Sequence, residues 1–154
     1  MELTKNDLNM TVWVKKTYTD NNRKWYKVDA NWKTLWRLAV EISKRLLWKN
    51  KSYYNDFWDI WDFVIVENIK NIKVTWNKAE DKVYYKHTWF KWHMKERTFW
   101  QMIIKNPEKT LWFAINWMLP KNKLRKQRMK RLKLFPTTSN KYDNLSPEIL
   151  NINE

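Results

Sequence analysis

The sequence contains no glycine and no cysteine, and it has only four prolines in 154 residues. The absence of cysteine excludes disulfide frameworks, thiolate zinc sites and cysteine nucleophiles, and it is compatible with a reducing intracellular compartment. The absence of glycine is harder to reconcile with folding, because turns and helix ends need positive φ, which glycine adopts at least cost. Average usage predicts roughly 11 glycines in a chain of this length. Instead tryptophan, normally the rarest residue, occurs 13 times, so the two anomalies need one explanation.

Long apolar runs are also missing. No stretch is long enough to span a bilayer, and the first fourteen residues lack the basic start and apolar core of a secretory signal. We therefore expect no membrane partner.

Acidic residues are outnumbered: 31 Lys and Arg stand against 16 Asp and Glu, which gives a net charge of +15. An excess of this size in a small domain favours a polyanionic partner, most simply nucleic acid.

Strand-like and helix-like segments alternate along the chain, which predicts one α/β domain. The strand-like runs are Lys24–Val28, Asp62–Val66, Ile72–Val74 and Lys82–His87. The helix-like segments are the apolar repeat between Leu35 and Leu46, Arg97–Asn106, and a segment that starts at Asn106 with Pro107 and ends at Pro120. We expect an N-terminal extension over 1–14, a domain over 15–135 and a flexible polar tail over 136–154.

The most basic segment is Lys121–Lys133, which has eight basic residues among thirteen and no acid. Because these charges repel one another, the segment is costly without counter-charge, and we expect it to contact phosphate. A solvated helix face is the alternative. Leu124, Met129 and Leu132 form an apolar side that either anchors the segment to the domain or inserts in a groove. The candidate phosphate contacts are Lys121, Lys123, Arg125, Lys126, Arg128, Lys130, Arg131 and Lys133.

A second basic stripe runs along and after the first expected helix, and a plain solvated face is again the alternative. Its members are Lys33, Arg37, Lys44, Arg45, Lys49 and Lys51. The turn Asn31–Thr34 that precedes it is either a phosphate seat at a helix start or, as we favour, a structural turn. Asp29 and Asp62 are interpreted as capping or turn residues.

The segment "KVYYKHTWFKWHMK" contains both histidines. Two histidines six apart, without cysteine or an intervening carboxylate, make a poor metal site, and no nucleophile lies nearby. We therefore expect no metal, cofactor or catalytic residue, and interpret the segment as an RNA-facing loop. Tyr84 and Tyr85 either stack on unpaired bases or belong to the core. The candidate contacts here are Lys78, Tyr85, Lys86, His87, Lys91 and Lys95.

Several separated motifs together resemble one family. Over about residues 15–135, "WYKVDANWKTLWRLA", "WDFVIVEN", "VTWNKAEDKVYYKHTW" and "NWMLPKNKL" resemble, in order and spacing, the bacterial-type ribosomal protein L13 family. The resemblance implies a three-layer α/β/α domain, with a small, mainly parallel sheet flanked by helices and a basic C-terminal segment. It also implies a non-enzymatic constituent of the large ribosomal subunit that binds large-subunit rRNA beside neighbouring ribosomal proteins, supports assembly and takes no small-molecule substrate. Arg125 departs from the family pattern, which usually has glycine there.

Within these motifs, tryptophan repeatedly stands where the family has glycine. The positions are Trp32, Trp36, Trp48, Trp61, Trp76, Trp89, Trp92 and Trp117. Trp25 matches a tryptophan of the family, and Trp13, Trp58, Trp100 and Trp112 stay open. Our hypothesis is that most of these residues are glycine in the living protein, because UGA codons that mean glycine were translated as tryptophan.

Two other functional readings compete with the ribosomal one. A non-ribosomal module could bind single-stranded nucleic acid by stacking bases on genuine tryptophan rings, which requires those rings on one exposed sheet face. An RNA-directed enzyme, with the basic surface merely holding substrate, is the third reading.

Overall fold

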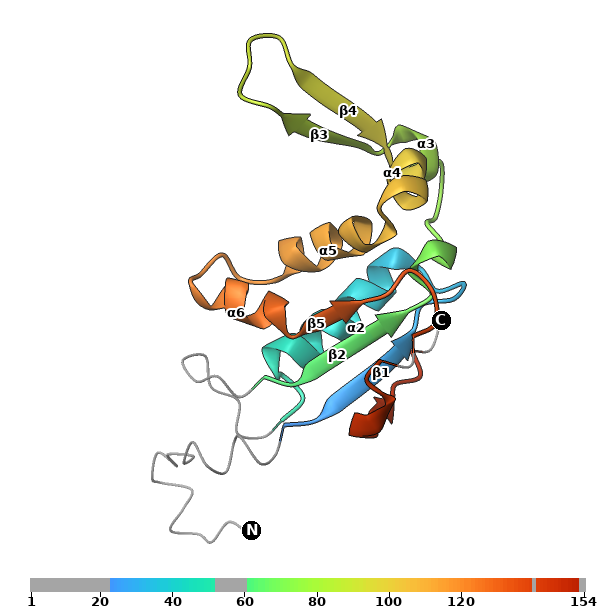
Figure 1. Ribbon diagram of the computed structural model, residues 1–154, viewed down its shortest axis with the longest axis vertical. Helices are drawn as coiled ribbons and strands as arrows, with labels where there is room; N and C mark the ends of the chain where they lie inside the picture. The colour runs from blue at the N-terminus through green and yellow to red at the C-terminus, as the bar shows by residue number, and fades with distance from the viewer. Residues whose placement is uncertain (1–22, 52–60, 140, 153–154) are drawn as a thin grey trace, which may run out of the picture.

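The computed structural model describes residues 23–51, 61–139 and 141–152. Its centre is a four-stranded parallel sheet of order β5-β2-β1-β6, and a separate antiparallel hairpin, β3–β4, projects from the body (Figure 1). The strands are β1 Trp25–Asp29, β2 Phe63–Glu67, β3 Val83–His87, β4 Met94–Thr98, β5 Leu132–Leu134 and β6 Glu148–Ile149. The helices are α2 Leu35–Leu47, α3 Lys78–Asp81, α4 Phe99–Lys105, α5 Pro107–Met118 and α6 Leu124–Lys130, with 3-10 turns η2 Ile69–Asn71 and η3 Asp143–Leu145. The expected α/β class with a mainly parallel sheet is confirmed.

The main core lies between the sheet and helices α2 and α5. Helix α2 repeats apolar residues at helical spacing, and Leu38, Ala39, Ile42 and Leu46 are all buried. This face packs on β2 and on α5, which contributes the buried Leu111 and Ile115. Strand β2 is an almost continuous apolar run, as expected for a central parallel strand covered on both faces.

The opposite face of the sheet is covered, within the described residues, by the C-terminal segment rather than by an α-helix. Trp25 stacks on Phe63 with ring centroids 4.1 Å apart, and Tyr142 adds a third ring at 5.6 Å from Trp25. Lys27 forms ion pairs with Glu67 (3.1 Å) and with Asp143 (2.9 Å). The third layer that the family resemblance implied is therefore built here from residues around η3.

The tail predicted to be flexible has a defined place in its described part. Strand β6 pairs in parallel with β1, and the Leu150 N–H donates to the Lys27 carbonyl oxygen (2.9 Å). Ile152 is buried in the main core. Polar composition suggested flexibility, but an exposed edge of β1 has unpaired backbone groups that a returning strand satisfies. The predicted extension over 1–14 lies outside the described residues.

Some element boundaries differ from the sequence prediction. The run Ile72–Val74 makes only a single bridge, between Lys73 and Thr34. The helix predicted to start at Arg97 starts at Phe99, because Thr98 forms a capping box with Gln101. Strand β4, just before it, was not predicted. Pro107 occupies the first turn of α5 as expected, although the Asn106 side chain makes no capping hydrogen bond.

Among the described residues, five tryptophans have a backbone in the left-handed region. Their φ values are 60° at Trp32, 64° at Trp48, 63° at Trp76, 64° at Trp89 and 64° at Trp92. Trp48 ends α2: its N–H donates to the Arg45 carbonyl oxygen and the next N–H, of Lys49, reaches back to Lys44. This is the helix-ending arrangement in which glycine usually supplies the left-handed residue.

Candidate nucleic-acid interface

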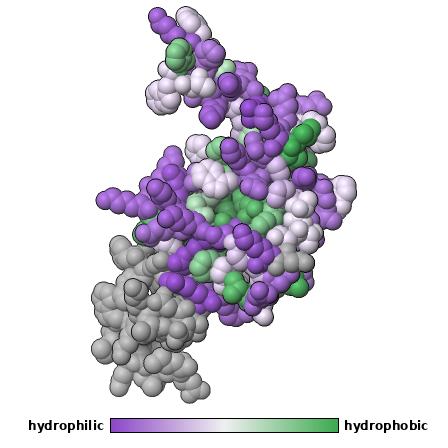
Figure 2. All heavy atoms as spheres, viewed as in Figure 1, coloured by the Kyte–Doolittle hydropathy of each residue, from purple (hydrophilic) through white to green (hydrophobic). Residues whose placement is uncertain are grey.

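The basic segment Lys121–Lys133 is anchored to the domain by its apolar side chains. Met129 and Leu132 are buried in the main core, and Leu124 packs on the buried rings of Trp48 and Trp61. Of the two alternatives for this apolar side, the structure favours anchoring. The cations that α6 and its preceding loop leave exposed are Lys121, Lys123, Lys126 and Lys130. Figure 2 shows hydrophilic side chains reaching outward at this end of the molecule.

Two arginines of the same segment point inward. Arg128 is 1% exposed, and its guanidinium lies 4.5 Å from the centroid of the Trp61 ring. Arg131 is also buried and donates to the Trp61 carbonyl oxygen. Leu124, Arg128 and Arg131 are spaced i, i+4 and i+7, so they share one face of the segment. Helical spacing in the sequence therefore distinguishes these two arginines from the exposed cations. Arg125 and Lys133 are half-exposed.

The second basic stripe divides in a similar way. Arg37 and Lys49 are exposed, and Lys44 is exposed but paired with Glu41 at 2.7 Å. Arg45 lies over the Tyr26 ring, 4.9 Å from its centroid. The Lys33 ammonium donates to the Ile152 carbonyl oxygen, so it fastens the C-terminal segment. Part of this stripe thus stabilises the fold.

Lys51 belongs to a buried polar cluster around Asp62. The Asp62 carboxylate is 1% exposed and accepts hydrogen bonds from Lys51 Nζ (2.8 Å), Trp48 Nε1 (2.8 Å) and the Lys24 N–H (3.0 Å). Burial lowers the pKa of Lys51, and the Asp62 carboxylate opposes that shift. The Lys51 ammonium is half-buried and its charge is already paired with Asp62, so this residue contributes to structure.

The turn Asn31–Thr34 is satisfied from within the fold. The Trp32 N–H donates to the Asn71 carbonyl oxygen (3.1 Å), and the Lys33 N–H donates to the carbonyl oxygen of Ala30 (3.2 Å). Asp29 accepts from the Asn31 N–H at 3.0 Å, as expected of a turn residue. The structural reading of this turn is therefore favoured over a phosphate seat.

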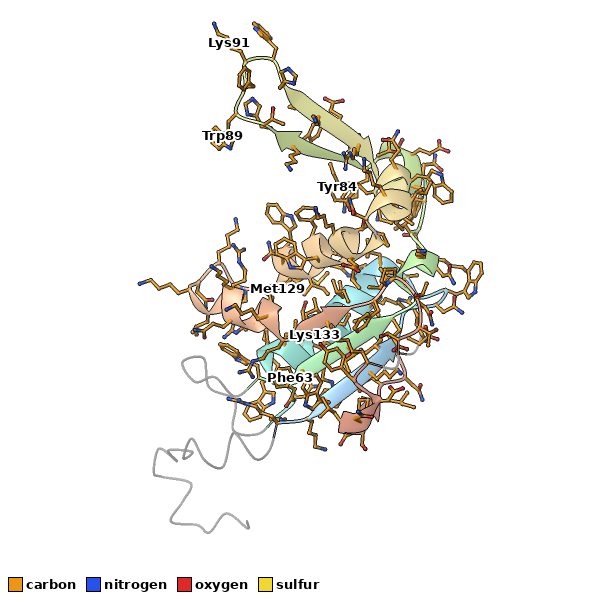
Figure 3. The ribbon with its side chains drawn as sticks, viewed as in Figure 1. Phe63, Tyr84, Trp89, Lys91, Met129 and Lys133 are labelled. Carbon is orange, nitrogen blue, oxygen red and sulfur yellow. The ribbon has the colours of Figure 1, made fainter. Side chains whose placement is uncertain are left out.

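The β3–β4 hairpin carries the remaining candidates. Tyr85, Lys86, His87, Lys91 and Lys95 are all exposed, and Lys78 is exposed at the start of α3. Figure 3 shows Trp89 and Lys91 at the tip of the hairpin, and Tyr84 at its base near α5.

The two tyrosines of β3 have different surroundings. Tyr84 is half-buried and stacks on Phe113 of α5, with ring centroids 5.9 Å apart, and burial raises the pKa of its phenol. Tyr85 is 63% exposed. Of the two roles considered for these tyrosines, Tyr84 therefore packs against the body of the domain, and Tyr85 is accessible for stacking on a base.

The structure adds two cations that sequence reasoning missed. Arg97 of β4 and Lys109 of α5 line the same cavity as Lys86 and Lys95. Strand alternation after Met94 would have predicted Arg97, because residues two apart on a strand share a face and Lys95 was already a candidate. No sequence signal pointed to Lys109, because its position depends on how α5 packs against the hairpin.

The described residues contain no cluster of metal ligands and no membrane-spanning helix. Within 23–51, 61–139 and 141–152, no three or more His, Cys, Asp or Glu side chains gather as a metal-binding group. None of the helices in those same ranges has the length and apolarity needed to cross a membrane.

Comparison with known proteins gives one consistent result. The model of the family described as "Ribosomal protein L13" matches residues 23–141. The large ribosomal subunit protein uL13 of Thioalkalivibrio sulfidiphilus is 40% identical over 130 residues, which cover 84% of this chain and 92% of that protein. The uL13 protein of Rubrobacter xylanophilus is 42% identical over 126 residues, covering 82% of this chain and 88% of that protein.

Proposed function

This chain belongs to the ribosomal protein L13 family, so it is a structural component of the large ribosomal subunit and not an enzyme. We propose that it acts there by binding large-subunit rRNA and supporting subunit assembly in the cytoplasm. The partners in this proposal are the rRNA and the neighbouring large-subunit proteins. The observation that carries the rRNA proposal is the set of exposed cations on a firmly anchored segment, with Lys121, Lys123, Lys126 and Lys130 as its main members.

The anchoring explains how these cations act on RNA. Met129 and Leu132 fix α6 to the core, so the lysines are held together on one surface although their charges repel. Phosphates placed among them relieve that repulsion and release condensed counterions. Since lysine reads charge and not sequence, α6 positions RNA, and specificity comes from RNA shape or from exposed bases.

The arrangement of the exposed tryptophans does not support a stacking module. Trp32 lies in a turn, Trp36 on α2, Trp76 in a loop, Trp89 at the hairpin tip and Trp117 in the last turn of α5. A module that binds single strands by stacking needs its rings on one platform. These rings are dispersed over separate elements.

Salt dependence tests the proposal. We expect the logarithm of the affinity for an rRNA fragment to fall linearly with the logarithm of salt concentration, because binding releases counterions. Replacing Lys123, Lys126 and Lys130 by Gln should reduce that slope by about 2 to 3 and weaken binding at low salt. The measurement is a fluorescence-anisotropy titration at several salt concentrations.

A charge-matched triple variant is the control. Lys70, Lys73 and Lys105 are also exposed but belong to η2, to the residues after it and to α4, so their replacement by Gln lowers net charge by the same amount without touching α6. If both triple variants changed the slope equally, the proposed α6 contact would be wrong. An affinity that did not respond to salt would contradict the phosphate mechanism as a whole.

A further inference from the structure

A cavity of about 640 Å³ lies between the β3–β4 hairpin and helix α5. One wall belongs to the hairpin and the other to α5. In Figure 1 the hairpin extends above α5. The size of the cavity falls within the range of sites that hold small ligands or single groups of a larger partner, about 300–1,000 Å³. A nucleic-acid duplex is too wide to enter such a cavity, whereas one unstacked nucleotide fits.

The hairpin wall brings like charges together. In the antiparallel register, Lys86 stands opposite Lys95, and Tyr84 stands opposite Arg97. Residues two apart on a strand share a face, so these three cations and the tyrosine lie on the same side of the hairpin. Like charges directly opposite each other destabilise a strand pair. An anion placed between them would relieve that repulsion.

The α5 wall supplies aromatic rings and a further cation. Trp112 and Phe113 line the cavity with ring centroids 5.4 Å apart in an edge-to-face arrangement, and Phe113 continues to Tyr84. Lys109 lies one helical turn before Phe113 and faces the same space. None of the described residues that line the cavity is acidic. Cations beside ring faces, without acids, match the chemistry of a nucleotide, which has a phosphate and a planar base.

We propose that this cavity seats one unpaired nucleotide of RNA. Lys86, Lys95 and Arg97 hold its phosphate, and Trp112 and Phe113 contact its base. The inference rests on the proposed rRNA-binding function and adds a division of labour to it. The exposed lysines of α6 position RNA backbone, and the cavity recognises a position where the RNA leaves its helix.

The test compares two RNAs of equal charge: a stem-loop with an unpaired uridine loop, and a blunt duplex with the same number of phosphates. Wild-type protein should bind the stem-loop roughly tenfold more tightly, since stacking on one base gives about that preference. The double variant Lys86→Gln/Lys95→Gln should lose the preference. The charge-matched control Lys70→Gln/Lys105→Gln should weaken both RNAs equally and keep the preference.

An aromatic pair of variants separates stacking from charge. Trp112→Ala should lower stem-loop affinity several-fold without changing duplex affinity. Trp100→Ala removes an exposed ring of α4 that does not line the cavity, and it should change neither. Circular dichroism confirms that each variant is folded.

The outcomes distinguish this inference from the function on which it rests. If the wild-type protein bound neither RNA at moderate salt, the proposed function itself would fail. If it bound both, but the cavity variants and their controls behaved alike, only the cavity assignment would be overturned. Polyglutamate serves as a third ligand: cavity variants that lost affinity for it while keeping the stem-loop preference would assign the site to an acidic peptide and overturn the proposal.

Discussion

At the scale of single residues, the left-handed tryptophans carry a local cost. An L-residue with a side chain brings its Cβ too close to the carbonyl oxygen in this conformation, which costs roughly 1–2 kcal/mol per residue. Trp76, Trp89 and Trp92 have this backbone while 89%, 94% and 95% of their surface is exposed, so burial of the ring offsets little of the cost. Glycine would remove the cost at each of these positions.

The backbone therefore predicts the effect of restoring glycine. In protein produced with the printed sequence, Trp89→Gly should raise the free energy of unfolding by about 1 kcal/mol, because the left-handed strain disappears. Trp100→Gly is the matched control: this ring is also exposed, but it lies in α4 with negative φ. There glycine should lower stability by roughly 0.5–1 kcal/mol. Urea denaturation gives both values, and equal signs for the two variants would contradict the argument.

The gene and the native protein test the recoding hypothesis directly. We expect a TGG codon at Trp25 and TGA codons at Trp32, Trp36, Trp61, Trp76, Trp89 and Trp117. Intact-mass spectrometry of protein isolated from its own ribosomes should give a lower mass than the printed sequence, by one indole side chain for each recoded position. The left-handed backbone supports the hypothesis at five positions but does not extend to Trp36, Trp61 and Trp117, whose φ is not positive. TGG codons throughout would end it.

At the scale of elements, the hairpin contacts α5 through the half-buried phenol ring of Tyr84. Burial raises the pKa of Tyr84 above its ordinary value of 10.0. The folded state therefore holds this proton more tightly than the unfolded state. Its contribution to stability is complete below pH 10 and is lost as the pH rises through the higher folded pKa. Tyr26 is shifted in the same direction, also by burial.

Tyr84→Phe isolates that contribution. Phenylalanine keeps the ring contact with Phe113 but cannot ionise, so the variant should lose less stability than the wild type above pH 10. The difference between the two proteins cancels the effects of Tyr26 and the lysines. Denaturation midpoints measured between pH 8 and 11 provide the test. Parallel curves for the two proteins would show that ionisation of Tyr84 does not loosen the hairpin.

The elements also show which parts of the site were readable from sequence. The apolar repeat of α2, the continuous apolar β2 and the proline-bounded α5 gave their positions correctly, because each is set by local periodicity or capping. Local pattern also identified Leu124, Met129 and Leu132 as the apolar side of the basic segment. Charge does not separate Arg128 and Arg131 from the exposed cations, because only their helical spacing from Leu124 places them on the inward face. Lys109 needed the packing of two elements, which no single stretch of sequence records.

At the scale of the whole molecule, the C-terminal segment closes the fold. It was expected to be flexible because it is polar, but its partner β1 lies more than a hundred residues earlier in the chain. Its acids pair with lysines at and just before β1: Asp143 pairs with Lys27 on the strand, and Glu148 with Lys24, the residue that precedes it. Composition describes a segment by itself and cannot report an open sheet edge elsewhere. This is why the class of fold was predictable and its outermost strand was not.

Ending the chain at Ser139 should therefore affect the whole molecule. The edge of β1 would lose its pairing with β6, so stability should fall, and the protein should self-associate as its concentration rises. Urea denaturation and light scattering measure the two effects. Phosphate binding at α6 should persist, because Met129 and Leu132 still anchor that helix.

Two isoleucines of the same segment sharpen this prediction. Ile152 is 7% exposed and packs in the main core, whereas Ile149 is 77% exposed on β6. Ile152→Ala should cost about 2–5 kcal/mol, while Ile149→Ala should stay within about 0.5 kcal/mol of wild type. If both substitutions were neutral and the shortened chain stayed monomeric with an unchanged midpoint, the segment would not be part of the folded unit. If only Ile152→Ala destabilised the protein, the C-terminal segment would belong to the core. The rRNA could then contact the surface near β1 only beside this segment.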